Sequence, residues 1–156
     1  MLNTIVYDIE TTGLYYDKNR IIQIAGYNVN TEEYFNEYIN PGPKHPISEE
    51  VTNINNITNE ILLDKENAKV ILSKFIEFCG EKCYLIAHNN NGFDRLFLLS
   101  ELKRNKFPKQ KWKYLDTLTL ARKELPELNS HTLDKLRDYY QININKENTH
   151  NALVDT

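Results

Sequence analysis

Two acidic residues near the N-terminus, Asp8 and Glu10, have the type and spacing that a shared metal site requires. They lie two positions apart at the end of an alternating segment, and such side chains point to one face of a β-strand. Two carboxylates this close repel each other unless a proton or cation lies between them, and Mg²⁺ or Mn²⁺ prefers oxygen ligands. A solvated strand edge is the alternative. The small turn Thr11-Thr12-Gly13 that follows favours a ligand site, because it lets backbone groups approach a ligand.

Histidine is the other side chain whose chemistry suits a hydrolytic site, and the sequence contains four. An imidazole with an unperturbed pKa of roughly 6.5 is largely neutral near physiological pH and can accept a proton. His88 ends an apolar segment, which favours a hydrogen-bonded structural role. His150, taken alone, is typical of an exposed residue, and His45 and His131 carry no spacing signal.

The acidic pair needs a sheet to position it, and five segments have the alternation or the apolar run of a β-strand. They are residues 2–9, 20–29, 33–39, 83–87 and 112–115. Turn-forming residues separate the second segment from the third, so the first three are expected to form a meander. Three prolines and a glycine in residues 40–46 exclude regular structure there, and residues 48–59 are expected to be irregular or briefly helical.

Four further segments have the apolar periodicity of helices that pack on a sheet. They are residues 60–78, 93–105, 117–124 and 132–140. Hairpin-linked strands followed by strand–helix–strand units predict an α/β domain with a mixed five-stranded sheet and helices on both faces. Ligands bind such sheets at the strand ends, where loops form a crevice.

Length and composition limit the classes of protein that this chain can belong to. With 156 residues, of which 40% are hydrophobic, it is expected to form one compact domain over residues 1–156. The opening residues lack the features of a signal peptide, and no stretch approaches membrane-spanning length. Cys79 and Cys83 form neither a disulfide framework nor a zinc quartet. The sequence therefore predicts no membrane partner and a reducing compartment, either the cytoplasm or the nucleus.

The formal net charge of −3 argues against a protein that binds nucleic acid through a broad basic surface alone. Two divalent cations would make the net charge positive, so the charge does not exclude a nucleic-acid substrate. Residues 103–113 contain six Lys or Arg and no acid, with Phe107 and Trp112 interleaved. This basic segment could follow phosphates, or it could complement the dipole at the end of a helix.

Three ordered motifs resemble those of the DnaQ-like exonucleases, a superfamily named for four acidic residues. DIETTGL at residues 8–14, with RIIQIA at 20–25, resembles the first motif, and LIAHNNNGFD at 85–94 resembles the second. HNALVD at 150–155 is similar to the third motif of the DEDDh subgroup, which has a histidine five residues before the last aspartate. DTLTLAR at 116–122 also resembles a family stretch. The resemblance extends from Ile5 to Asp155 and implies an RNase H-like fold.

The resemblance implies a 3′–5′ exonuclease that hydrolyses phosphodiester bonds at DNA or RNA ends and releases nucleoside 5′-monophosphates. Asp8, Glu10 and Asp155 would bind one divalent ion, Mg²⁺ or Mn²⁺. Asp8 would also bind a second such ion together with Asp94, and His150 would deprotonate the attacking water. Two cations about 3.5 to 4 Å apart can activate a nucleophile and stabilise the leaving oxygen, so the physical chemistry agrees.

The resemblance also implies where the substrate would lie. Thr11 and Thr12 would contact the terminal 3′ sugar through backbone groups, and Leu14 would wedge against the terminal base. Asn89 and Phe93 would line the path of the strand. Leu14 and Phe93 suit a hydrophobic core equally well. The implied partners are a single-stranded or frayed 3′ end of DNA or RNA, and a polymerase or another replication or repair protein.

The end of the sequence departs from the family pattern, which has alanine after the last aspartate and continues a helix for several turns. Thr156 is the last residue here. We therefore expect a truncated or short C-terminal helix in which Asp155 is poorly placed, because a final turn lacks the hydrogen bonds that follow it. This feature favours an alternative function, a catalytically weak or inactive nuclease-fold module that binds nucleic acid or a polymerase. The four acids and the histidine favour the enzyme.

Overall fold

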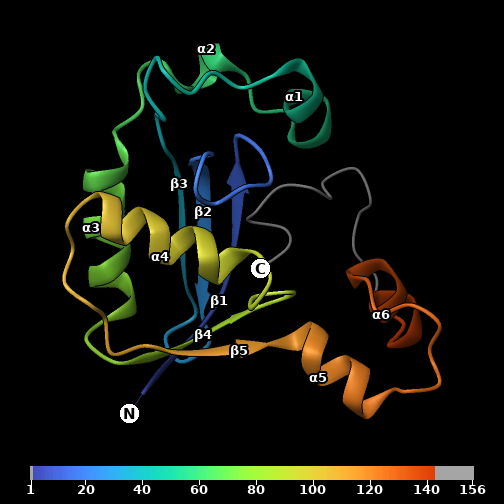
Figure 1. Cartoon of the computed structure of the whole chain (residues 1–156). Helices are drawn as coiled ribbons and strands as arrows, with labels where there is room; N and C mark the ends of the chain where they lie inside the picture. The colour runs from blue at the N-terminus through green and yellow to red at the C-terminus, as the bar shows by residue number, and fades with distance from the viewer. Residues whose placement is uncertain (1, 143–156) are drawn as a thin grey trace.

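A computed structural model describes residues 2–142 of the chain (Figure 1). Its sheet contains β1 (Asn3–Thr11), β2 (Ile21–Asn28), β3 (Glu33–Tyr38), β4 (Cys83–Ala87) and β5 (Lys113–Asp116). The strand order is β3-β2-β1-β4-β5, in which β2 is antiparallel to both β1 and β3, and β4 is parallel to both β1 and β5. The predicted mixed five-stranded α/β sheet is confirmed, and β1 lies at its centre.

The described residues form six helices, and three of them match the predicted segments closely. These three are α4 (Asp94–Arg104), α5 (Thr117–Glu124) and α6 (Leu133–Tyr139). The others are α1 (Glu49–Asn55), α2 (Asn59–Leu62) and α3 (Ala68–Cys79). Residues 48–59 are thus briefly helical, as expected. The single helix predicted over residues 60–78 is wrong, because the structure divides it into α2 and α3.

Backbone pairing and a capping residue explain the break between α2 and α3. The Asn40 backbone N–H donates to the Glu66 carbonyl at 2.9 Å, which ties this linker to the end of β3. Asn67 then caps α3, and its side chain accepts hydrogen bonds from the backbone N–H groups of Lys69 and Val70. An asparagine at this position satisfies N–H groups that lack partners within the helix, so the helix begins here.

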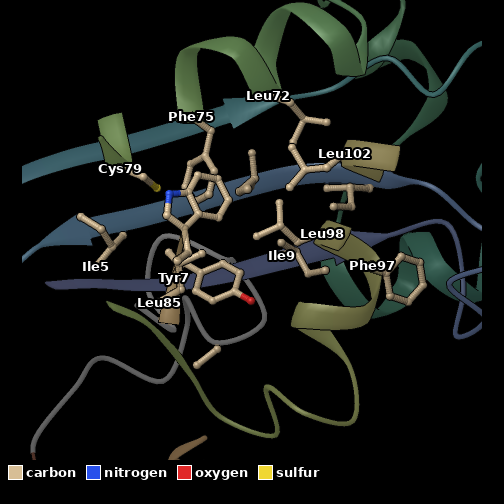
Figure 2. Close-up of a cluster of buried hydrophobic side chains, with 14 of the residues drawn as sticks. Ile5, Tyr7, Ile9, Leu72, Phe75, Cys79, Leu85, Phe97, Leu98 and Leu102 are labelled. Atoms are coloured by element: carbon tan, nitrogen blue, oxygen red, sulfur yellow. The ribbon is translucent and has the colours of Figure 1, made fainter. Parts of the chain in front are cut away.

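The main core lies between one face of the sheet and the two helices α3 and α4. Every second residue of β1 is buried on this face, namely Ile5, Tyr7 and Ile9. Figure 2 shows these side chains pointing toward Phe75 of α3 and Leu98 of α4. Because side chains alternate along a strand, the intervening residues of β1 point to the opposite face. The burial of one face therefore directs Asp8 and Glu10 to the other.

A β-bulge in β2 links a second, smaller core to the end of β1. Glu10 pairs with Gln23 and Thr11 with Ile21, so Ile22 is the extra residue. Ile21 joins the main core, whereas Ile22 packs with a separate cluster whose members include Ile57 and Leu62. The second core thus holds the α1–α2 segment beside the end of β1 that carries Glu10.

Both cysteines are buried and free. Burial raises the pKa of the Cys79 thiol well above its ordinary value, and its hydrogen bond with Cys83 adds to the rise. These thiols therefore behave as core residues. In the part of the chain that the structure describes, no helix is long and apolar enough to cross a membrane.

Candidate active site

Asp8 and Glu10 lie on the face of β1 that α3 and α4 leave uncovered. They pair with Ala25 and Gln23 of β2 in successive positions of the same face, and both acids are half-buried. Residues two apart on a strand point in the same direction, so both carboxylates face one region of space. The structure therefore places these two predicted site residues together.

Asp94, the first residue of α4, lies near these two acids. It stands at the point where β4 separates from β1. The last parallel pair between these strands is Val6 with Ile86, which leaves the backbone of Ile9 without a β4 partner. The Ile9 backbone N–H donates instead to the Asp94 carboxylate. Since Ile9 lies between Asp8 and Glu10 in the sequence, this hydrogen bond brings the third predicted acid to the same strand end.

The Asp94 side chain is 3% exposed, and its environment opposes ionisation. Burial is the largest cause of a pKa raised to about 7, and the charges of Asp116 and Glu10 also raise it. Backbone hydrogen bonds from Asp94 itself and from Ile9 act in the opposite direction. A buried carboxyl that is repelled by neighbouring carboxylates is a group whose ionised form a cation would stabilise.

The loop between β4 and α4 is fixed by Asn90, which is fully buried. Its side-chain oxygen accepts a hydrogen bond from the Tyr7 hydroxyl at 2.6 Å, and its side-chain nitrogen donates to the Leu115 carbonyl at 2.8 Å. Asn90 thus joins β1, β5 and the loop that leads to Asp94. The neighbouring Asn89 has a φ of +60°, a left-handed conformation that asparagine tolerates better than most residues.

Asp116 holds the same loop from the end of β5, a role that sequence reasoning missed. Its carboxylate accepts hydrogen bonds from the backbone N–H groups of Asn91 and Leu118, each at 2.9 Å. Burial acts to raise the pKa of Asp116, but several backbone donors outweigh it, so the pKa lies below its ordinary value. Asp116 caps α5, and an aspartate directly before a predicted helix was the available signal.

His88 has the structural role that the sequence predicts. Its Nδ1 lies 3.1 Å from the Thr117 hydroxyl, and the ring is half-buried. Burial is the largest cause of a lowered pKa, which favours the neutral imidazole. The hydrogen bond and the burial together account for this histidine without a catalytic role.

Asn55 contacts the acidic pair from α1 and is the clearest residue that sequence reasoning missed. It is 6% exposed, and its Nδ2 donates to Glu10 Oε2 at 3.3 Å. Its Oδ1 accepts from the Ile57 backbone N–H at 3.0 Å, which fixes the orientation of the amide. Asn55 therefore orients the Glu10 carboxylate. The segment was expected to be only briefly helical, and nothing in its local pattern places it against Glu10.

With Glu10 as a metal ligand, as the sequence predicts, replacement of Asn55 by leucine, which has a similar size, should lower kcat about tenfold and leave KM nearly unchanged, because residues that orient metal ligands typically contribute 10- to 100-fold. Asn53→Leu is the matched control, since Asn53 is an exposed asparagine of the same helix. Steady-state kinetics on a labelled oligonucleotide would measure both constants. Equal kcat values for Asn55→Leu and Asn53→Leu, with both variants folded, would exclude the positioning role.

The predicted substrate residues occupy different environments. Thr11 and Thr12 are buried, and the Thr12 hydroxyl accepts a hydrogen bond from the Arg20 backbone N–H at 3.1 Å. Leu14 is 77% exposed, so it does not belong to the core. Phe93 is half-buried against the main core and lies 4.9 Å from Phe97 between ring centroids. Leu14 is therefore available to a ligand, whereas Phe93 also contributes to packing.

The remaining predicted catalytic residues, His150 and Asp155, lie outside the described residues, and so does the expected position of Asp155 in a short helix. Within residues 2–142, no three His, Cys, Asp or Glu side chains form a group that could hold a metal ion by itself. The carboxylate oxygens of Asp8, Glu10 and Asp94 nevertheless have the chemistry that Mg²⁺ and Mn²⁺ prefer. The raised pKa of Asp94 supports a role for that residue beside a cation.

The basic segment, residues 103–113, does not form a uniform positive surface. Arg104 is partly buried and forms an ion pair with Glu101 at 3.0 Å. Lys111 forms an exposed ion pair with Glu81, and Lys113 lies over the Tyr84 ring. These contacts favour the structural interpretation of the segment.

Comparison with known proteins gives a family and two groups of relatives. Residues 5–156 match the model of the family RNase_T, which is described as exonuclease. The PolC-type DNA polymerase III of Streptococcus pyogenes serotype M2 (strain MGAS10270) is 36% identical over 143 residues. That of Streptococcus mutans serotype c is 35% identical over 154 residues. These alignments cover 90% and 97% of this chain, which spans about 10% of the length of each polymerase.

Solved structures show the same fold. Escherichia coli exonuclease I in complex with a dA16 oligonucleotide matches with a TM-score of 0.83 at 20% identity, over 99% of this chain and 38% of that one. A moderately thermophilic exonuclease I from Methylocaldum szegediense matches with a TM-score of 0.82 at 21% identity, over 99% and 38%. The predicted RNase H-like architecture is thereby confirmed.

Proposed function

Since this chain belongs to the RNase_T exonuclease family and is DnaQ-like, we propose that it is a metal-dependent 3′–5′ exonuclease. It hydrolyses phosphodiester bonds at DNA or RNA ends and releases nucleoside 5′-monophosphates. One observation carries the proposal: the buried Asp94 carboxyl binds the backbone of β1 between Asp8 and Glu10. Asp94 of the second motif thus lies beside the strand end that carries Asp8 and Glu10 of the first, and such strand ends are where open α/β sheets bind ligands.

Exonucleases of this family generally use divalent metal ions. Asp8, Glu10 and Asp155 would hold one Mg²⁺ or Mn²⁺, and Asp8 and Asp94 would hold a second. Such ions supply charge neutralisation at the phosphodiester that is cleaved. Asn55 orients Glu10, and Asp116 fixes the loop that leads to Asp94. His150 would accept the proton of the attacking water.

The substrate that we propose is a single-stranded or frayed 3′ end. Exonuclease I, which shares the fold, has been solved with oligonucleotides bound. Leu14 is exposed beside Thr11 and Thr12, which supports its contact with a terminal base. Asn89 and Phe93 belong to the loop that leads from β4 to Asp94 and would line the strand. The PolC-type relatives support a polymerase as a protein partner.

A catalytically weak nuclease-fold module that binds nucleic acid or a polymerase is the second candidate. The two candidates differ in metal binding, because only the enzyme needs the acids as ligands.

Calorimetric titration of the full chain with Mn²⁺ distinguishes the two. The enzyme should bind two ions, and Asp8→Ala should remove this binding because the side chain would contact both. Asp64→Ala is the matched control, since the Asp64 side chain is 79% exposed and its ion-pair partner is the adjacent Lys65. Absence of Mn²⁺ binding to the unmodified protein would contradict the proposal and support the binding module.

A further inference from the structure

The loop between β1 and β2, residues 12–20, presents three consecutive exposed apolar or aromatic side chains, and we call it the aromatic loop. Leu14 is 77% exposed, Tyr15 65% and Tyr16 44%. The loop follows Glu10 almost directly, so it lies beside the candidate site. Adjacent large side chains left in water at such a position are typical of a binding surface.

Hydrogen bonds within the loop fix its backbone. The Asn19 Oδ1 accepts from the Tyr15 backbone N–H at 3.0 Å, and its Nδ2 donates to the Thr12 carbonyl at 3.3 Å. The Asn19 backbone N–H donates in turn to the Tyr15 carbonyl at 2.7 Å. A side chain at Gly13 would meet Asn19 at 2.7 Å, so glycine is required for this close approach. The exposed rings therefore project from an ordered turn.

A buried ion-pair group connects the aromatic loop to the last turn of α4. Arg104 donates to the Asn19 carbonyl at 3.3 Å and to the Tyr16 carbonyl. Its partner Glu101 has a side chain only 3% exposed, and Arg20 Nε lies 3.9 Å from the same carboxylate. A buried carboxylate that holds two guanidinium groups contributes little net stability, because desolvation offsets the attraction. Its effect is to fix the geometry of the loop.

The two ends of α4 set the distance between the loop and the candidate site. Asp94 is the first residue of α4 and Arg104 is the last, 11 residues in all, which corresponds to a length of about 16 Å. Stacked bases repeat about every 3.4 Å along a strand. Arg104 therefore holds the backbone of Tyr16 and Asn19 toward the end of α4 that is farther from Asp94, so the tyrosines follow Leu14 away from the candidate site.

The charges around the aromatic loop have a small positive excess, with Lys18, Arg20 and Arg104 against Asp17 and Glu101. Lys18 Nζ lies 5.6 Å from the centre of the Tyr15 ring. The group formed by Arg20, Arg104 and Glu101 carries one net positive charge at neutral pH. A surface that combines exposed rings with cationic groups has the chemistry of sites that bind single-stranded nucleic acid without sequence preference.

We propose that Tyr15 and Tyr16 form a base-stacking platform for single-stranded nucleic acid, upstream of the terminal nucleotide that Leu14 would contact. The identity of the ligand rests on the proposed function. The platform binds bases by their faces, and Arg104 and Glu101 are positioning residues that hold it toward the strand. It would retain a long strand during trimming and contribute far less to the binding of a dinucleotide.

Fluorescence anisotropy with 5′-labelled oligothymidylate of about 12 nucleotides, in chelator, tests the platform without catalysis. Tyr15→Ala/Tyr16→Ala should weaken binding by about tenfold or more, because each stacked base contributes substantially to affinity. Tyr15→Phe/Tyr16→Phe keeps the rings and should bind like the unmodified protein. Tyr34→Ala is the matched control, since Tyr34 is 68% exposed on the edge strand β3.

An abasic strand of the same length separates stacking from phosphate contacts. The alanine and phenylalanine double variants should bind it equally, because it has no bases to stack. Unchanged binding of oligothymidylate by the alanine double variant, or equal losses in the alanine and phenylalanine variants, would overturn the platform. Failure of the unmodified protein to bind the oligonucleotide would also overturn it.

Hydrolysis in Mn²⁺ distinguishes this failure from failure of the proposed function. If the platform exists, the alanine double variant raises KM for the long strand about tenfold and raises KM for a dinucleotide far less, because a dinucleotide has at most one base upstream of the terminal one. If the unmodified protein binds through the tyrosines but cleaves neither substrate, the platform stands and the exonuclease proposal fails.

Discussion

Asp94→Asn should lower the rate of phosphodiester cleavage by roughly 100-fold or more, since loss of one preorganised charged group at a reacting centre has effects of this size. The substitution keeps the shape of the side chain and its ability to accept the Ile9 hydrogen bond. It removes only the negative charge that would face a cation. The activity of the variant on a 5′-labelled oligonucleotide, with Asp64→Asn as the exposed control, measures the effect.

The same variant should be more stable than the unmodified protein when metal is removed. The folded-state pKa of Asp94 is about 7, above the ordinary value of 3.8. Below the ordinary pKa the carboxyl is protonated in both the folded and the unfolded chain, so the substitution does not change the free energy of unfolding. As pH rises toward 7, the unfolded chain loses its proton first, so the folded protein loses stability.

The gain in the free energy of unfolding from Asp94→Asn should therefore be negligible near pH 4. It should reach roughly 2 kcal/mol or more at pH 8, since one pKa unit corresponds to about 1.4 kcal/mol. Urea unfolding in chelator at both pH values would measure it. Lower stability of the variant at pH 8, or a gain that is independent of pH, would contradict the buried carboxyl described here.

Phe75→Ala should destabilise the protein by about 4 kcal/mol, which is typical of a buried aromatic ring replaced by a methyl group. Phe75 is fully buried at the centre of the main core. Its ring lies 5.4 Å from that of Phe35, and it also contacts the rings of Tyr7 and Trp112 at 6.2 Å between centroids. The lost contacts and the cavity both add to the effect.

Many single domains have a free energy of unfolding of only about 5 to 15 kcal/mol, so this substitution alone could remove a large share of the stability of the protein. Urea unfolding at constant pH would measure the difference. Val70→Ala is the control in the same helix. Because Val70 is 37% exposed, this substitution should lower the free energy of unfolding far less than Phe75→Ala does. Equal losses for Phe75→Ala and Val70→Ala would contradict the position of the core.

The sheet and most of its helices were predictable because their patterns reflect local burial. The alternation around Tyr7 and the apolar run of β4 identify strands directly. The division of residues 60–78 into α2 and α3 was not predictable, since it depends on pairing between Asn40 and the distant Glu66. The bulge at Ile22 likewise results from two separate cores on the two sides of β2.

The acids of the candidate site could be recognised from the sequence because Asp8, Glu10 and Asp94 stand at fixed positions in motifs. Asn55, which orients Glu10, and Arg104, which holds the aromatic loop, could not. Asn55 reaches Glu10 from 45 positions away, and Arg104 reaches Tyr16 from 88 positions away. Such contacts depend on how helices are placed on the sheet, and no local spacing encodes them.

One measurement tests the central claim most directly. The full chain is incubated with 5′-labelled single-stranded DNA and RNA of matched sequence, in Mg²⁺, Mn²⁺ or chelator, with Asp8→Ala as the inactive control. We predict a metal-dependent ladder that shortens from the 3′ end, is absent in Asp8→Ala and identifies the preferred nucleic acid. Intact substrate under every condition, or equal cleavage by Asp8→Ala, would contradict the claim that these acids form an exonuclease site.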